Sequence, residues 1–326
     1  MREITLIAAG VTGAAYVAYT VYRRCRAEPA PSVPVLFDTA SPSSALPFHI
    51  LDVFTDEAEA SSGNQLLVVE DRADVLTSDA MQAIAAEIGF AESAFVCSAG
   101  AVRIFTIDEE VPQAGHPIIG LAEIVGGPSS VRGKHICLRT KKGPIDVKSG
   151  QPSSWFMSQD APEWLGHASR LAVASILVQR DGHESKLVGS AFPIGSTCGL
   201  PYALVPVTTE AALDALAVDA GASPERLLAE CTALPNGLAV YFYHRTGTQS
   251  CRTRMFCHEG GRWVEDVATG SAAGPLACHL APISACFTQG SARRAKIQVN
   301  AAKREGARVE VGGSVRRVAS GRWSVP

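Results

Sequence analysis

The stretch that decides the fold is RIFTIDEEVPQAGHPIIGLA, residues 103–122, because a second version of it follows later in the chain. That second version is RMFCHEGGRWVEDVATGSAAGPLA, residues 254–277. Each begins with a strand-like run, continues through an acidic loop, and reaches a short loop motif that opens an apolar run. This internal repeat predicts two similar domains, which we place at 48–160 and 161–326.

The apolar runs of the repeat, 117–125 and 271–280, are predicted to be helices without a polar face. A helix that is apolar all round is typical of a protein core. Another helix is predicted between Thr77 and Gly89, and most other segments have the pattern of short strands. We therefore expect an α+β fold in which each domain wraps a curved, mostly antiparallel sheet around one central apolar helix.

The two predicted core helices begin at glycines, which let a ligand approach the backbone closely. The first N–H groups of a helix have no partner inside it, and the helix dipole places positive charge at the same end. Such an end favours an anion. If both ends face one cleft, they can hold a carboxylate and an enolate-like negative charge.

Several strings of this sequence resemble the PhzF-like family of phenazine-biosynthesis proteins, which has the diaminopimelate-epimerase fold. They include LDVFTDEAEASSGNQLLVV (51–69), MQAIAAEIGFAESAFV (81–96), AGHP (114–117) and EDVATGSA (265–272), and they occur in the family's order. The resemblance spans residues from about 48 to the end. The chain departs from the family pattern at Gln65 and Val267, where the family usually has proline.

The resemblance implies a cofactor-independent isomerase and suggests a homodimer. Epimerases of the same fold use two cysteines, but Ala114 and Thr269 occupy the corresponding positions here, so a two-thiol mechanism is excluded. The PhzF-like branch uses a carboxylate instead. The resemblance assigns catalytic positions to Glu92, His116 and Asp266, and substrate-binding positions to Asn64, Gly115, Gly270 and Ser271.

Glu92 is the predicted general acid and base. On pattern alone it reads as a solvated carboxylate at a helix end, and the resemblance reverses that interpretation. The neighbouring Phe90 and Phe95 are expected to desolvate the carboxyl group and to raise its pKa. Glu92 would then take a proton from one carbon of a small carboxylate and return it to another, while His116 and Asp266 orient the substrate and balance charge.

Other site chemistries find less support. The formal net charge of −3, without a long basic run, excludes the concentrated positive surface of a nucleic-acid-binding protein. Nine irregularly spaced cysteines contain no C-x-x-C pair, and a metal site at Cys251, Cys257 and His258 lacks a fourth ligand, so no metal is expected. A serine hydrolase using Ser271 lacks the G-x-S-x-G elbow, and no Gly-rich nucleotide-binding motif is present.

The N-terminus differs from the rest. Residues from Ile4 to Tyr22 are uncharged and are followed by Arg23, Arg24 and Arg26. This segment, within 1–26, is interpreted as a transmembrane anchor, a cleaved targeting segment or a misplaced start. If it spans a membrane, the arginines leave the catalytic part in the cytoplasm. Residues 27–47 are rich in proline and serine and are predicted to be a linker.

A non-catalytic relative is the alternative from another class: a membrane-tethered protein that binds a small carboxylate or a protein partner without turnover. The three predicted catalytic residues are all present, which favours the enzyme. The altered turn residues and the N-terminal segment favour divergence. The substrate stays open, because the walls of a pocket come from loops that vary independently of the acid/base group.

Overall fold

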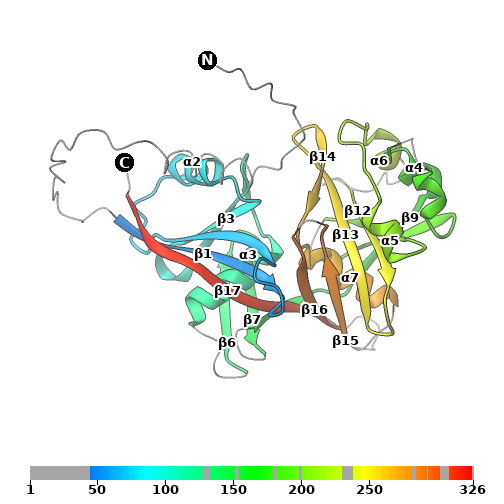
Figure 1. Cartoon of the computed structure of the whole chain (residues 1–326). Coiled ribbons are helices and arrows are strands. Elements are labelled where there is room, and N and C mark those ends of the chain that lie inside the picture. The colour runs from blue at the N-terminus through cyan, green and yellow to red at the C-terminus, as the bar shows by residue number, and fades with distance from the viewer. Residues whose placement is uncertain are drawn as a thin grey trace, which may run out of the picture.

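The computed structural model describes residues 45–127, 133–150, 154–178, 182–197, 200–229, 238–280, 284–291, 293–301 and 308–324. These residues form two lobes that lie side by side, one around α3 (Gly115–Gly126) and one around α7 (Gly270–Leu280) (Figure 1). The predicted anchor, 1–26, lies outside the described residues. Within them, no helix is long and apolar enough to cross a membrane.

The N-terminal lobe places α2 (Ser78–Ile88) on the outside of its sheet and α3 on the inside. A short 3-10 turn, η1 (Ser98–Gly100), joins two of its strands. Its strands are β1 (Ala45–Thr55), β2 (Asn64–Glu70), β3 (Glu92–Val96), β4 (Val102–Phe105), β5 (Glu110–Val111), β6 (His135–Thr140), β7 (Gly143–Ser149) and β8 (Ser154–Gln159).

The C-terminal lobe surrounds α7 and carries the short helices α4 (Arg170–Ala174), α5 (Glu210–Asp214) and α6 (Glu225–Ala229), with a 3-10 turn, η2 (His183–Lys186). Its strands are β9 (Glu163–Ser169), β10 (Ala191–Ser196), β11 (Tyr202–Pro206), β12 (Ala239–Arg245), β13 (Ser250–Glu259), β14 (Arg262–Asp266), β15 (Ser284–Gln289) and β16 (Ala295–Ala301). The last strand, β17 (Val309–Ser324), joins the lobes.

The strand pairing confirms the internal repeat. In the N-terminal lobe β2 and β3 are parallel, β3–β4 and β4–β5 are antiparallel, and α3 follows. In the C-terminal lobe β11 and β12 are parallel, β12–β13 and β13–β14 are antiparallel, and α7 follows. Most other pairings are antiparallel, so the α+β expectation, with a mostly antiparallel sheet around a central helix, holds in both lobes.

One side-chain cluster occurs at the same place in each repeat. Arg103 pairs with Glu110 at 2.7 Å, and Arg254 pairs with Glu265 at 2.8 Å. Each guanidinium also lies 5.0 Å from the centroid of the phenylalanine two residues further along its own strand. The acidic loop of the sequence repeat therefore supplies a partner for its arginine, which closes the hairpin before each core helix.

The core helices are buried as their composition predicts. Ile118 and Leu121 of α3, and Ala272 and Leu276 of α7, are fully buried in one hydrophobic cluster that continues through both lobes. The small residues matter because the sheet wraps tightly: a Cβ at Gly120 would lie 2.4 Å from Leu66. A bulkier or more polar helix would not fit inside these sheets.

Helix α2 ends where the sequence indicates and sets the position of Glu92. Thr77 caps it by accepting from the backbone N–H of Ala80, and Gly89 ends it in the left-handed conformation with φ of 69°. The apolar face packs on the outer side of the sheet. β3 starts immediately after this turn, and Glu92 is its first residue.

Two boundaries differ from the sequence expectations. β1 begins at Ala45, so the last three residues of the predicted linker, 45–47, form strand opposite Ser324, Trp323 and Arg322 of β17. Pairing with β2 starts only at Phe48, past the proline that cannot donate. The partner strand lies at the other end of the chain, so local composition could not indicate it.

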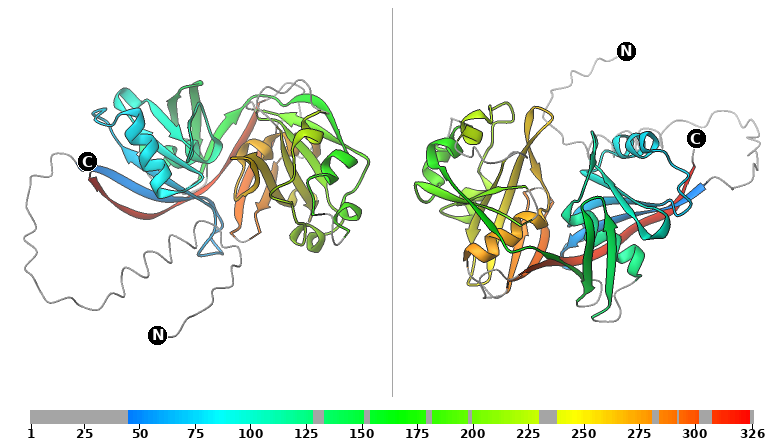
Figure 2. Two further views of the ribbon diagram at one scale, coloured as in Figure 1. Left: turned by 90° about the horizontal axis from the view of Figure 1, so that it is seen from above. Right: turned by 180° about the vertical axis from the view of Figure 1, so that it is seen from behind.

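β17 also crosses the predicted domain boundary. Its first part pairs with β16 and β8, and its second part pairs with β1. The end of the predicted C-terminal domain, 161–326, thus lies in the sheet of the N-terminal lobe, beside β1 (Figure 1). Figure 2 shows from above and behind that this strand passes from one lobe to the other. The division at residue 160 otherwise stays a prediction.

Arg293 links the lobes through the loop before β2. Its side chain donates to the carbonyl oxygens of Gly63 at 2.6 Å and Ser62 at 3.0 Å, and it pairs closely with the buried carboxylate of Asp52. The backbone N–H of Gly63 donates in turn to the carbonyl of Arg294 at 2.7 Å. These bonds fix the residue that follows, Asn64, against the C-terminal lobe.

Replacing Arg293 with alanine should lower the free energy of unfolding by about 2–4 kcal/mol, because buried acceptors lose a charged donor. Urea unfolding followed by circular dichroism measures this. Arg262→Ala, on an exposed position of β14, is the matched control and should stay within about 0.5 kcal/mol of the wild type. Equal stability of the two variants would show that the Arg293 contacts do not hold the lobes together.

Candidate active site

The starts of α3 and α7 meet between the lobes. A Cβ placed on Gly115 would lie 3.6 Å from the backbone nitrogen of Ser271 and 3.7 Å from the Cα of Gly270. Ala114 precedes α3 in an extended conformation and offers no side-chain cap. The two helix starts, whose first N–H groups have no partner within the helix, therefore lie together, and their dipoles add there.

The start of α7 is held by side chains that sequence analysis did not identify. Pro275 has no N–H, so the carbonyl of Ser271 loses its usual partner within the helix. The hydroxyl of Thr197 lies 3.4 Å from that carbonyl oxygen, and the Gln159 amide donates to the carbonyl of Gly270 at 3.2 Å. No motif of the sequence marks Gln159 or Thr197, because both approach α7 through the tertiary fold.

Glu92 lies beside these helix starts. Its carboxylate oxygen is 3.5 Å from Nδ1 of His116, the second residue of α3, and only 20% of the Glu92 side chain is exposed. Burial raises the pKa of Glu92 well above its usual value, and the carboxylates of Asp266 and Glu259 raise it further. The carboxyl group is thus a candidate acid and base with its protonated form favoured.

The cause of this burial differs from the one predicted. Phe95 and Phe90 pack in the outer cluster with α2, not against the carboxyl group. Side chains of a strand alternate between its faces, so residues 92 and 95 of β3 point to opposite sides. Glu92 loses water because it faces α3 and the C-terminal lobe.

His116 is buried and neutral. Only 4% of it is exposed, and burial lowers its pKa to about 3, although a hydrogen bond with the backbone of Gln65 partly opposes this. Its Nε2 atom has no hydrogen-bond partner among the described residues. A buried ring nitrogen without a partner costs free energy unless a ligand completes it.

Asp266 is held by donors from both lobes. Asn64 Nδ2 donates to its Oδ1 at 3.0 Å across the lobe boundary, and the Thr269 hydroxyl donates to its Oδ2 at 2.5 Å. Burial raises the pKa of Asp266 to about 6, and these donors partly offset that rise. Asn64, predicted to bind substrate, thus has a contact that orients a predicted catalytic residue.

The remaining predicted residue with a side chain, Ser271, lies at the start of α7. Its hydroxyl is 2.6 Å from the hydroxyl of Tyr202 on β11. Tyr202 was not predicted as a site residue. The structure therefore brings all seven predicted site residues to the junction of the two helix starts, while their roles stay predictions.

The site is rich in carboxylates. Glu92 from one lobe and Asp266 and Glu259 from the other influence one another electrostatically, and the thiol of Cys257 lies 3.4 Å from Glu259. Burial raises the pKa of that thiol, so it stays protonated. The alternative metal site fails on distance, because Cys251 and Cys257 are six residues apart on β13, about 20 Å along a strand.

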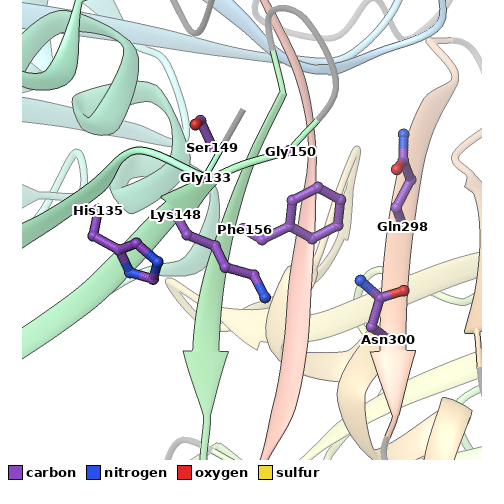
Figure 3. Close-up of a pocket in the computed structure, with 8 residues that line it drawn as sticks. All are labelled: Gly133, His135, Lys148, Ser149, Gly150, Phe156, Gln298 and Asn300. Carbon is purple, nitrogen blue, oxygen red and sulfur yellow. The ribbon is translucent and has the colours of Figure 1, made fainter. Parts of the chain in front are cut away.

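Two surface hollows lie away from this junction. One, of about 490 Å³, opens between β6–β8 and β16 (Figure 3) and is lined by Gly133, His135, Lys148, Ser149, Gly150, Phe156, Gln298 and Asn300. The other, of about 660 Å³, is lined by residues of β9, β10 and the ends of β11, β12 and α7. Neither hollow is lined by a predicted site residue. We therefore place the candidate site where the predicted side chains lie together, and not in either hollow.

Comparison with known proteins gives a consistent assignment. The family model described as phenazine biosynthesis-like protein (PhzC-PhzF) matches residues 51–321. Trans-2,3-dihydro-3-hydroxyanthranilate isomerase from Pseudomonas aeruginosa is 35% identical over 72% of this chain and 79% of its own length. The protein of the same name from Pseudomonas chlororaphis is 33% identical with the same coverage.

Solved structures share the fold. A PhzF-family phenazine biosynthesis protein from Bacillus anthracis superposes with a TM-score of 0.70 at 21% identity, covering 86% of this chain and 99% of its own. A predicted epimerase from Pseudomonas aeruginosa gives 0.68 at 28% identity, covering 86% and 100%. A probable proline racemase from Agrobacterium radiobacter gives 0.51 at 12% identity, covering 86% and 93%. These likenesses confirm the expected diaminopimelate-epimerase-like architecture.

The charges in the site predict a specific pH dependence of stability. Asp266 has a higher pKa in the folded chain, about 6, than the ordinary 3.8, so the folded chain binds more protons between these values and stability falls as the pH rises from 4 to 6. His116 has the opposite effect. Burial lowers its pKa in the folded chain from 6.5 to about 3, so the unfolded chain binds more protons between these values and stability falls as the pH falls below 6.5.

Asp266→Asn should therefore gain stability relative to the wild type between pH 4 and pH 7, by up to about 3 kcal/mol. Urea unfolding at pH 4, 5, 6 and 7 measures this difference, and the contribution of His116 cancels in it. Asp146→Asn, on an exposed position of β7, is the control. A difference between Asp266→Asn and wild type that is the same at every pH would contradict the raised pKa.

Proposed function

The chain is an isomerase that belongs to the phenazine biosynthesis-like (PhzC-PhzF) family, and we propose that it moves a proton between carbons of a small carboxylate without a cofactor. The observation that carries this proposal is the position of Glu92. Its carboxyl group lies 3.5 Å from His116, in the first turn of α3, and the start of α3 abuts the start of α7.

In the first step, carboxylate Glu92 removes a proton from a carbon activated by the substrate. The electron pair of the broken C–H bond enters the conjugated system of the substrate, which becomes enolate-like. The N–H groups at Gly115 and Gly270 supply fixed donors for this charge and for the substrate carboxylate. The raised pKa of Glu92 makes its carboxylate a stronger base.

In the second step, the carboxyl group of Glu92 returns the proton to a different carbon, and the double bonds of the substrate shift accordingly. Atoms and electrons balance within the substrate and Glu92, so no redox partner is needed. Neutral His116 can orient the Glu92 carboxyl group through Nδ1, which lies 3.5 Å from it. Asp266 would hold a donor group of the substrate.

The substrate is proposed as a class. The named relatives act on trans-2,3-dihydro-3-hydroxyanthranilate, a small carboxylate, and this chain is proposed to take that compound or one of similar size and charge. Assembly as a homodimer and anchoring through the segment from Ile4 to Tyr22 remain predictions. The non-catalytic alternative has no specific observation in its favour.

Glu92→Gln should abolish proton transfer, because the amide cannot accept and return a proton. The wild type is incubated in D2O with trans-2,3-dihydro-3-hydroxyanthranilate and with a panel of other small carboxylates, and deuterium at carbon is measured by NMR and mass spectrometry. We expect the rate of Glu92→Gln to fall by at least about a thousandfold.

Glu87→Gln is the matched control, since Glu87 is exposed on α2 and the substitution is chemically the same. It should keep the wild-type rate. Retained exchange in Glu92→Gln would refute the role of Glu92. No exchange with any carboxylate in the wild type, together with measurable binding, would favour the non-catalytic alternative.

A further inference from the structure

Gln289, at the end of β15, has a side chain that is fully buried and fully hydrogen-bonded. Its Oε1 accepts from the backbone N–H of Thr269 at 3.2 Å. Its Nε2 donates to the backbone carbonyl of Asp266 at 3.0 Å and to the Thr269 hydroxyl at 2.9 Å. A backbone N–H only donates and a carbonyl only accepts, so this orientation of the amide is the one that satisfies both.

The contacts of Gln289 decide where the proton of Thr269 points. The hydroxyl oxygen receives a hydrogen bond from Gln289, which leaves its own single proton for another acceptor. Asp266 Oδ2 lies 2.5 Å away and is that acceptor. If Gln289 did not donate, the hydroxyl could rotate and leave the carboxylate with fewer donors.

We propose that Gln289 is a positioning residue, which acts through Thr269 to hold the carboxylate of Asp266 in place for the reaction. This inference rests on the proposed function for its catalytic meaning, although the hydrogen-bond relay can be tested without turnover. Gln289 lies 23 residues beyond Asp266 in sequence, and neither the family-like strings nor the repeat includes it.

The relay opposes a strongly unfavourable environment. Glu259 on β13 adds negative charge near Asp266, and Glu92 on β3, Tyr241 on β12 and Cys257 on β13 also interact with it electrostatically. The nearest donors to the carboxylate are the Asn64 amide, the Thr269 hydroxyl and the backbone N–H of Ala268. The Ala268 N–H is the most distant of the three, at 3.4 Å. Losing one of these donors favours the protonated acid, so the pKa of Asp266 should rise.

The test measures Asp266 directly. Carboxyl carbons of aspartate are labelled with 13C, the Asp266 signal is assigned with Asp266→Asn, and it is titrated in the wild type, Gln289→Met, Thr269→Val and Thr269→Ser. The first two substitutions should raise its pKa by about one unit, whereas Thr269→Ser keeps the hydroxyl and should restore the wild-type value. The double variant Gln289→Met/Thr269→Val should raise the pKa of Asp266 no further than either single variant does.

Gln82→Met is the matched control, because Gln82 also donates to a backbone carbonyl, that of Thr106 at 3.0 Å, but on the outer helix α2. It should leave the titration unchanged. An Asp266 titration in Thr269→Val and Gln289→Met identical to the wild type would overturn the proposal. If Gln289→Met does not fold, an unshifted Asp266 titration in Thr269→Val still overturns the proposal, because the relay acts through the Thr269 hydroxyl.

Kinetics then connects the relay to the reaction. This step requires that the wild type exchanges deuterium. The acid limb of the pH profile of kcat/KM should then move to higher pH in Gln289→Met and in Thr269→Val, by the same amount as the pKa of Asp266 measured by NMR. If the Asp266 titration shifts but the pH–rate profile does not, the hydrogen-bond relay is supported, but its role in the reaction is refuted. Absence of exchange in the wild type would refute the proposed function while leaving the titration result intact.

Discussion

The site depends on the contact between two helix starts that belong to different lobes. The starts of α3 and α7 lie against each other: a Cβ placed on Gly115 would be 3.6 Å from the backbone nitrogen of Ser271, and Ala114 offers α3 no side-chain cap. Two aligned dipoles of the same sign repel, so the arrangement needs support from elsewhere. β17 and the Arg293 contacts provide it by joining the lobes across the same boundary.

Negative groups gather where these positive ends meet. Glu92 and Asp266 both have raised pKa values, mainly because both are buried, and neighbouring carboxylates raise these pKa values further. The neutrality of His116 follows from the same burial and leaves its imidazole as a hydrogen-bonding group without charge. Because one carboxyl can hold a proton while the helix ends hold negative charge, the same region suits proton removal and proton return.

Sequence reasoning recovered the parts of the fold that local patterns encode. The repeat, the apolar core helices and the caps of α2 at Thr77 and Gly89 all followed from spacing and composition. The strand status of residues 45–47 did not, because their partner is β17, more than 270 residues away. The faces of β3 were also misjudged, since Phe95 was expected beside Glu92 and lies on the other face.

The site residues also fall into those that the sequence indicates and those that only the tertiary fold reveals. Glu92, His116 and Asp266 were found through motifs, and the structure brings them together. Gln159, Thr197, Tyr202 and Gln289 were missed because each is an ordinary polar residue whose function depends on what the tertiary fold places beside it. A motif marks the reacting groups, but it does not encode the hydrogen bonds that orient them.

The central claim, that both helix starts form one anion-binding place, can be tested by titrating 15N-labelled protein with anthranilate, a small aromatic carboxylate. The amide signals of Gly115, His116, Gly270 and Ser271 should shift together and fit one dissociation constant. Shifts confined to the start of one helix, or two different dissociation constants for the two helices, would contradict the account.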